Sequence, residues 1–249
     1  MKAWPYPKLI AHRGGGTLAP ENTLAAVRFG QSLGYRACEI DVKLSSDGVA
    51  MLLHDATLER TTSGKGDAGT LAWADLAKLD AGAWHSPEFR GEPIARFDAF
   101  AREILAKKAM VNIEIKPSPG RDKETGAHVA AVSAALFASA PVPPLLSSFS
   151  FAALGEAQIM SPELPRGWLT DRVEPADWDR LEALEAASLH TSHKNLLRAD
   201  VDRAHKLGLR VMIYTVNDIA RAEELFSWGV DGMFTDNLRV FAERFPKHL

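Results

Sequence analysis

The sequence has 249 residues, 46% hydrophobic and 24% charged, proportions that are typical of a globular chain and exclude a disordered one. A chain of this length can bury a sizeable core. Its formal net charge of -3 provides no long-range attraction to nucleic acid or to anionic lipid, so we expect neither as a partner.

The N-terminal segment and the single cysteine bear on the cellular compartment. The chain begins Met1-Lys2-Ala3-Trp4-Pro5-Tyr6-Pro7, which lacks the apolar stretch of about 7–15 residues that a signal peptide needs. No run reaches the roughly 18 apolar residues of a membrane span. Cys38 is the only cysteine and lies in a run that contains Ala37 and Ile40, which indicates a buried, unreactive thiol. We expect a cytoplasmic protein without stable membrane association.

Short apolar runs alternate with amphipathic stretches along the chain. The runs that predict strands are residues 9–12, 37–42, 110–115, 144–149, 166–170, 187–191, 210–216 and 229–234. The stretches with helical spacing include residues 22–33, 97–107, 125–139, 197–207 and 218–228. Alternation of this kind is typical of parallel strands joined by helices. Eight such units predict that the strands close into a (β/α)8 barrel.

A ninth extended run, residues 49–54, follows the second strand too closely for a crossover helix. Only Ser45-Ser46-Asp47-Gly48 separates the two, and an Asp-Gly pair is a hairpin signal. We expect the ninth strand to run antiparallel to residues 42–44 and to bring His54 beside Asp41.

Residues 56–96 interrupt the alternation. They hold a turn-rich stretch at 61–66, one short predicted helix at 73–79, and prolines at Pro87 and Pro93. We expect a small inserted subdomain on the face of the barrel where the strands end, within a single domain that spans residues 1–249.

Three carboxylates fall on neighbouring predicted strands. Glu39 and Asp41 are two residues apart on one strand, so their side chains point to the same face, and Glu114 lies on the next strand. Three confined acids either raise one another's pKa or bind a hard divalent cation, and we favour the cation. Without His or Cys ligand spacing, Mg²⁺ or Ca²⁺ is expected rather than zinc. The alternative is a structural ion-pair network with nearby basic residues, namely Arg36, Lys43 and Lys116.

His12, at the end of the first strand, and His54 are expected to approach the carboxylates from two sides. Imidazole titrates near ~6.5, which suits acid and base catalysis at neutral pH. The pair indicates an in-line displacement in which one imidazole deprotonates the attacking hydroxyl and the other protonates the departing alkoxide. Arg13 offers a bidentate fork for a phosphate and Lys116 a point charge, although Lys116 could equally neutralise Glu114. Two further histidines, His190 and His193, flank a strand end and could line the mouth.

In their order along the chain, the motifs resemble the glycerophosphodiester phosphodiesterase family. They are His12-Arg13-Gly14, Pro20-Glu21-Asn22-Thr23, Glu39-Ile40-Asp41-Val42, His54-Asp55, Thr57-Leu58-Glu59-Arg60-Thr61-Thr62, Glu114-Ile115-Lys116, Ser147-Ser148-Phe149, Thr215-Val216-Asn217 and the run from Val230 to Asp236.

The resemblance implies a TIM barrel of the α/β class with a small insertion after the second strand. It implies hydrolysis of glycerophosphodiesters, such as glycerophosphocholine or glycerophosphoethanolamine, to glycerol 3-phosphate and an alcohol. Attack would come from the glycerol's neighbouring hydroxyl through a cyclic phosphate, with one Mg²⁺ or Ca²⁺ as cofactor. The residues would be Glu39, Asp41 and Glu114 for the metal, His12 and His54 for acid and base, and Arg13 and Lys116 for the phosphate.

Two departures from the family pattern lie near the mouth and bear on substrate preference: Tyr214 stands where tryptophan is frequent, and Ala95-Arg96-Phe97 lacks a common proline. A lysophospholipase D-like or other lipid phosphodiesterase on the same barrel remains open, and it would need an apolar rim. Apolar residues of the insertion could supply that rim or form a small core, namely Trp73, Leu76, Leu79, Trp84 and Phe89. A non-catalytic binding barrel is a third possibility, but it predicts loss of a site residue, and all are present.

Overall fold

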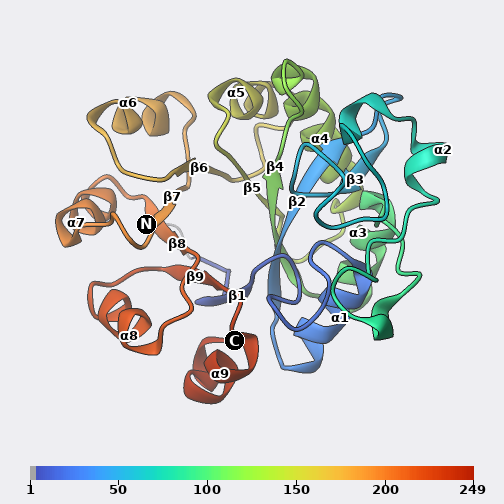
Figure 1. Cartoon of the computed structure of the whole chain (residues 1–249). Helices are drawn as coiled ribbons and strands as arrows, with labels where there is room; N and C mark the ends of the chain where they lie inside the picture. Colours follow the sequence, from blue (N-terminus) through green and yellow to red (C-terminus); the bar gives the residue numbers. More distant parts are fainter. Residues whose placement is uncertain (1–3) are drawn as a thin grey trace.

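Eight parallel strands form a closed barrel, as the alternating pattern predicts. The computed structural model describes residues 4–249; Met1, Lys2 and Ala3, part of the segment that we expect not to be a signal peptide, lie outside the described residues. The strands pair in the order β1-β9-β8-β7-β6-β5-β4-β2, and β1 also pairs with β2, which closes the ring (Figure 1). The barrel strands are β1 (Leu9–Ala11), β2 (Ala37–Leu44), β4 (Met110–Ile115), β5 (Leu145–Ser148), β6 (Arg166–Thr170), β7 (Ser188–Ser192), β8 (Arg210–Tyr214) and β9 (Gly232–Thr235).

Helices surround the barrel on its outside (Figure 1). They are α1 (Leu24–Ser32), α3 (Phe97–Ala106), α4 (Asp122–Leu136), α5 (Phe151–Met160), α6 (Pro175–Ala183), α7 (Arg198–Lys206), α8 (Ile219–Ser227) and α9 (Leu238–Arg244), with a final 3₁₀ turn at Pro246–His248. In the described part of the chain, no helix combines the length and the apolar character needed to cross a bilayer.

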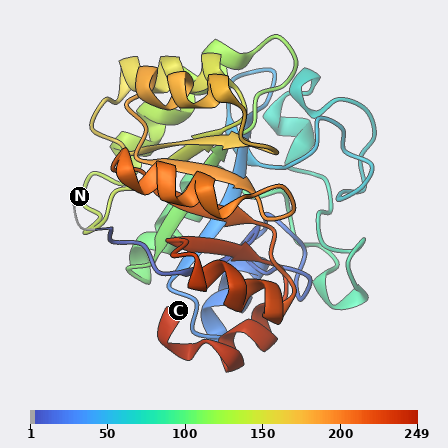
Figure 2. The same ribbon diagram turned by 90° about the vertical axis from the view of Figure 1, so that its left-hand side faces the viewer.

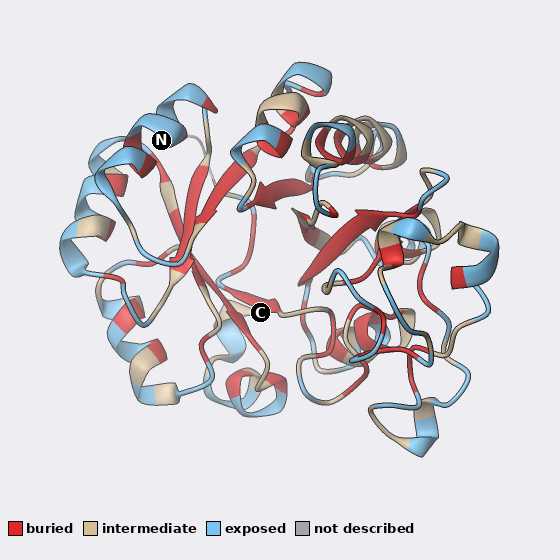
Figure 3. Cartoon of the chain, turned by 45° about the horizontal axis from the view of Figure 1, so that its top comes forward, coloured by how far each residue is buried: buried red, intermediate tan, exposed pale blue. Residues whose placement is uncertain are grey.

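Strands covered on both sides explain why the apolar runs are nearly continuous rather than alternating. All eight residues of β2 are buried, and Figure 3 shows buried strands at the centre, with the exposed residues on the helices and loops around them. Inside the barrel, Ile10, Ala37, Met212 and Phe234 form a separate apolar cluster. Since Ala37 is the first residue of β2, this cluster fills the end of the barrel where β2 begins and leaves the opposite end for polar side chains.

The predicted hairpin after β2 is confirmed. β3 (Ala50–Leu52) runs antiparallel to β2, with Val42 opposite Leu52 and Leu44 opposite Ala50. The backbone N–H of Leu53 donates to the carbonyl of Asp41 at 3.1 Å. His54, the next residue, is thereby held next to the carboxylate-bearing strand.

Segment 56–96 packs with Met51 and Leu53 of the preceding hairpin in an apolar cluster that is separate from the main core. It contains α2 (Trp73–Leu76), which ends three residues before the predicted helix does, and 3₁₀ turns at Ala68–Thr70 and Pro87–Phe89. Leu76 is fully buried in this cluster, and Trp73 and Leu79 pack against it, whereas Trp84 is 40% exposed. Figure 2 shows the segment, in cyan, standing apart from the ring of outer helices. Most of the residues considered for a lipid-binding rim therefore form the core of the segment.

Candidate active site

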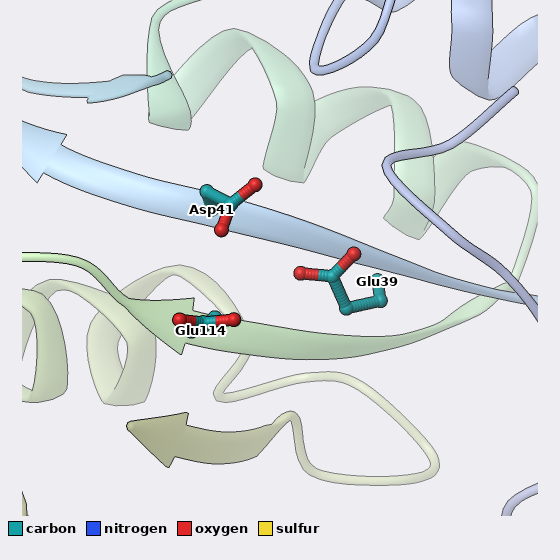
Figure 4. A group of neighbouring side chains, drawn as sticks. All are labelled: Glu39, Asp41 and Glu114. Carbon is teal, nitrogen blue, oxygen red and sulfur yellow. The ribbon is translucent and has the colours of Figure 1, made fainter. Parts of the chain in front are cut away.

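Three carboxylates meet at the end of β2 and β4. Asp41 and Glu114 are direct partners in the register of the two strands, and Glu39 lies two residues before Asp41. One ligand oxygen from each of the three lies within 4.8 Å of the others. Figure 4 shows Glu39 and Asp41 on one strand and Glu114 on its neighbour, with the carboxylates turned toward a shared space. The three carboxylates that the sequence predicts to lie together therefore do so in the structure.

The electrostatics of this cluster fit a bound cation. Burial and the charge of Asp41 raise the pKa of Glu39 to about 8 and that of Glu114 to about 7. Burial also acts to raise the pKa of Asp41, but Lys116 and Arg13 outweigh it, and the pKa is lowered. The Oδ1 atom of Asp41 is buried without a hydrogen-bond partner among the described residues. A hard divalent cation prefers oxygen ligands, and it would offset the repulsion between the carboxylates and give the unpaired oxygen of Asp41 a partner.

His12 follows β1 and reaches the cluster with one ring nitrogen. Its Nε2 lies 3.9 Å from Oε2 of Glu39, while its Nδ1 is hydrogen-bonded to Oδ1 of Asp236 at 2.6 Å. Burial acts to lower the pKa of His12, but the bond to Asp236 and the charge of Glu39 outweigh burial, so the pKa is raised. Asp236 is itself fixed by the side-chain amide of Asn217 at 3.0 Å. The imidazole is therefore oriented through one nitrogen and available through the other.

The loop after β1 is shaped to bring Asp236 close. Gly16 has a φ of +56°, and a Cβ at this position would lie 2.2 Å from the carbonyl oxygen of Asp236. Both the left-handed conformation and the close approach require glycine. The three-glycine run after β1, Gly14-Gly15-Gly16, therefore forms a tight turn and lets that turn pack against the strand end that precedes Asp236.

His54 has a carboxylate partner of the same kind. Its Nδ1 is hydrogen-bonded to Oδ1 of Asp55 at 2.6 Å. Burial lowers the pKa of His54, and the charge of Asp41 opposes this shift without reversing it. A lowered pKa leaves the ring unprotonated at neutral pH, the state that can accept a proton.

A chain of alternating charges connects the two sides of the site. Arg13 donates to Glu21 at 2.6 Å, Glu21 accepts two bonds from Arg60 at 2.7 and 2.8 Å, and Arg60 donates to Asp55 at 2.6 Å. Asp55 completes the chain at His54. The chain fixes the guanidinium of Arg13 and the imidazole of His54 relative to one another.

The position of Lys116 is compatible with both of its predicted roles, which are binding the phosphate and neutralising Glu114. Its Nζ lies 2.6 Å from Oε1 of Glu114 and 3.6 Å from Oδ1 of Asp41. Of the other basic residues considered for an ion-pair network, Lys43 donates to the carbonyl of Lys116 at 3.2 Å, and Arg36 binds the carbonyl of Leu249. The carboxylate cluster is thus only partly neutralised by Lys116 and by Arg13, whose Nε is 3.7 Å from Asp41.

Two cavities adjoin these residues. A deep one of about 180 Å³ runs into the barrel past His12, Arg13 and Glu39. A wider groove of about 620 Å³ lies over the loops after β4 and β5. Both are lined by the same four residues, His54, Glu114, Lys116 and Phe149. The site therefore has a narrow inner compartment and an open outer one on either side of a common wall.

The structure brings all seven predicted site residues together. One further histidine, His190, does not lie where the sequence analysis expects it. His190 does not flank a strand end at the mouth; it lies within β7, fully buried, on the floor of the deep cavity. His193, which follows β7, is half-buried. Sequence reasoning did not single out Asp55 or Asp236 as partners of the histidines. Both lie within the motifs that carry the family resemblance, and that was the only sign in the sequence that they belong to the site.

Comparison with known proteins gives a consistent result. The model of the glycerophosphoryl diester phosphodiesterase family matches residues 12–240. A glycerophosphodiester phosphodiesterase of Caldanaerobacter subterraneus subsp. tengcongensis is 34% identical over 92% of this chain and 93% of its own.

Among solved structures, a phosphodiesterase of Oleispira antarctica in complex with the product sn-glycerol-3-phosphate has a TM-score of 0.90 at 34% identity, covering 97% of both chains. A glycerophosphodiester phosphodiesterase of Agrobacterium tumefaciens has a TM-score of 0.80 at 30% identity, covering 95% of this chain and 99% of its own.

Proposed function

The chain belongs to the glycerophosphoryl diester phosphodiesterase family and is an enzyme of that class, and from this premise we propose that it hydrolyses glycerophosphodiesters such as glycerophosphocholine or glycerophosphoethanolamine to glycerol 3-phosphate and an alcohol. The observation that carries the proposal is the cluster of Glu39, Asp41 and Glu114 beside two histidines that are each anchored to a carboxylate. The product bound to the Oleispira relative is the product that this reaction gives.

Glu39, Asp41 and Glu114 would hold one Mg²⁺ or Ca²⁺. When bound, such an ion supplies positive charge that stabilises the negative charge developing on the phosphate oxygens. Arg13 and Lys116 would bind the same phosphate, Arg13 through a fork held in place by Glu21 and Lys116 as a point charge.

His54 and His12 would move the protons. The neighbouring hydroxyl of the glycerol attacks phosphorus and forms a cyclic phosphate as the bond to the departing alcohol breaks. His54, with its lowered pKa, accepts the hydroxyl proton, and His12, held by Asp236, donates a proton to the alcohol. Water then opens the ring to glycerol 3-phosphate, with the two imidazoles in reversed roles.

The two cavities would divide the substrate between them. The inner compartment of about 180 Å³ suits the glycerophosphate half, and the outer groove of about 620 Å³ receives the alcohol. Because the groove is open, we expect several headgroups to be accepted. We also propose that residues 1–249 act as one domain with 56–96 as a subdomain. The cytoplasmic location and the lack of a nucleic-acid partner stay predictions.

The test is release of glycerol 3-phosphate from glycerophosphocholine and glycerophosphoethanolamine, measured by a coupled dehydrogenase assay. We expect turnover of both. Cleavage of lysophosphatidylcholine in preference to either would instead favour the lipid-directed alternative. An enzyme that cleaves none of the three would contradict the proposal.

The pH dependence tests the role of His54. If His54 is the base, kcat/KM falls as the pH drops through its pKa, which burial places below the usual ~6.5. Asp55 accepts a hydrogen bond from His54 and raises that pKa. The substitution Asp55→Asn is therefore expected to move the acidic limb of the profile to lower pH. Asp98→Asn, which removes a carboxylate paired with Arg96 and Arg102 on α3, should leave the limb in place. A shift of the limb to higher pH would contradict the assignment.

A further inference from the structure

The floor of the deep cavity is polar, although it lies inside the barrel. Asn112 stands two residues before Glu114 on β4, and it pairs in register with Glu39. It therefore faces the same way as Glu114, one step deeper. Ser147 on β5 and His190 on β7 line the same cavity. None of these three side chains has a role in the proposed chemistry.

Two polar atoms on this floor lack partners among the described residues. Asn112 donates from Nδ2 to Ser147 at 2.9 Å, but its Oδ1 is buried and unpaired. The Nε2 of His190 is bonded to Ser188 at 2.8 Å, and its Nδ1 is likewise buried and unpaired. Asn112 is 3% exposed and His190 is fully buried. Because an unsatisfied buried polar group is costly, and most buried groups are paired, the two atoms indicate an occupant that forms hydrogen bonds.

The position of His190 is constrained by its neighbours. A Cβ on Gly167 of β6 would lie 2.3 Å from Nε2 of His190, so the ring occupies space that only glycine leaves free. On another side the ring lies 5.7 Å from that of Phe234. Burial lowers the pKa of His190 to about 3, so the ring is neutral and carries no charge that would attract an ion.

We propose that Asn112 and His190 form a hydroxyl-binding subsite that recognises the terminal hydroxyl of the glycerol half of the substrate. Asn112 Oδ1 can only accept, while His190 Nδ1 donates or accepts according to its tautomer. A hydroxyl group both donates and accepts, so it satisfies either tautomer. The inference rests on the proposed function, in which the neighbouring hydroxyl attacks phosphorus and the terminal one is left to be bound. It would make the enzyme selective for glycerol over shorter polyols.

The test compares glycerophosphocholine with the phosphocholine ester of propane-1,2-diol, which retains the attacking hydroxyl and lacks the terminal one. We expect the wild type to prefer the glycerol substrate by roughly 10- to 100-fold in kcat/KM, since one or two buried hydrogen bonds are lost. His190→Leu and Asn112→Leu should reduce this preference to about 3-fold or less by slowing turnover of the glycerol substrate alone. His190→Asn keeps a polar atom near the place of Nδ1 and should restore part of the preference.

Thr191→Val is the matched control. Thr191 is the neighbour of His190 on β7 and also has a buried, unpaired hydroxyl, but it faces the opposite side of the strand. We expect the preference to be unchanged in this variant. Gly167→Ala keeps both binding groups and displaces the His190 ring, so it should weaken the preference as His190→Leu does.

Equal turnover of the two substrates by the wild type would overturn the inference. Variants that slow turnover of both substrates alike would also overturn it, because that result is expected if the subsite binds only water. If the wild type cleaves neither substrate, the proposed function fails, and calorimetry with glycerol 3-phosphate and propane-1,2-diol 1-phosphate still tests the subsite. Equal affinity for the two phosphates would then exclude it.

Discussion

Replacing His12 with alanine is expected to lower kcat by about 10³-fold, with a much smaller change in KM. General acid catalysis by a positioned group contributes roughly 10²–10⁴-fold, and His12 is the imidazole whose orientation Asp236 fixes at 2.6 Å. Glu39, 3.9 Å away, and the phosphate ligands remain in the variant, so substrate binding should persist. Steady-state kinetics with glycerophosphocholine measure both constants.

His205→Ala is the control for this variant. His205 on α7 also forms a histidine–carboxylate pair, with its Nε2 2.9 Å from Asp231, but it does not line either cavity of the site. Its kcat should stay within about 2-fold of the wild type, as expected for a substitution away from the reacting groups. A His12→Ala enzyme that keeps more than about a tenth of the wild-type kcat would contradict a direct role in proton transfer.

Glu114→Gln is expected to lower the affinity for the divalent cation, and the activity at low metal concentration, by more than ~100-fold. Replacing a residue that only orients a metal ligand already lowers metal affinity or activity by about 10–100-fold. Glu114→Gln goes further, because it removes the charge of one of the three oxygen donors themselves. It also removes the negative charge that lies 2.6 Å from the ammonium of Lys116. Titration of EDTA-treated enzyme with Mg²⁺ and Ca²⁺, followed by glycerol 3-phosphate release, measures the shift.

The comparison for Glu114 is Glu103→Gln, which removes a carboxylate paired with Arg28 on the barrel's outside. We expect its metal titration to match that of the wild type. Activity that survives exhaustive chelation in the wild type would contradict the metal proposal. So would a Glu114→Gln enzyme that responds to metal as the wild type does.

The sequence predicted the features that depend on local pattern. The spacing of Glu39 and Asp41 placed both carboxylates on one face because side chains alternate along a strand. The Asp47-Gly48 turn predicted the hairpin, and with it the arrival of His54 beside β2. Both are confirmed by the pairing of β2 with β3.

Features that depend on distant contacts were not predictable in the same way. Asp236 is 224 residues from His12 in the chain, and no local pattern connects them. His190 was expected to flank a strand end and line the mouth. The predicted strand, residues 187–191, differs from β7 by only one residue at each end, but the burial of the ring depends on neighbouring strands that no local pattern reveals, such as Gly167 on β6 and Phe234 on β9. In segment 56–96, an apolar composition alone did not distinguish a core from a rim, and contacts around Leu76 decide for the core.

The chain of charges from Arg13 through Glu21, Arg60 and Asp55 to His54 has an evolutionary consequence. Every inner member bridges two partners, so neutralising one removes a hydrogen-bonded charge from both of its neighbours at once, which is costly where those neighbours are partly buried. A single substitution is therefore disfavoured, while paired exchanges that preserve the alternation are tolerated. These five positions should change together or not at all as the family diverges, although Arg13 and Asp55 are 42 positions apart in the numbering.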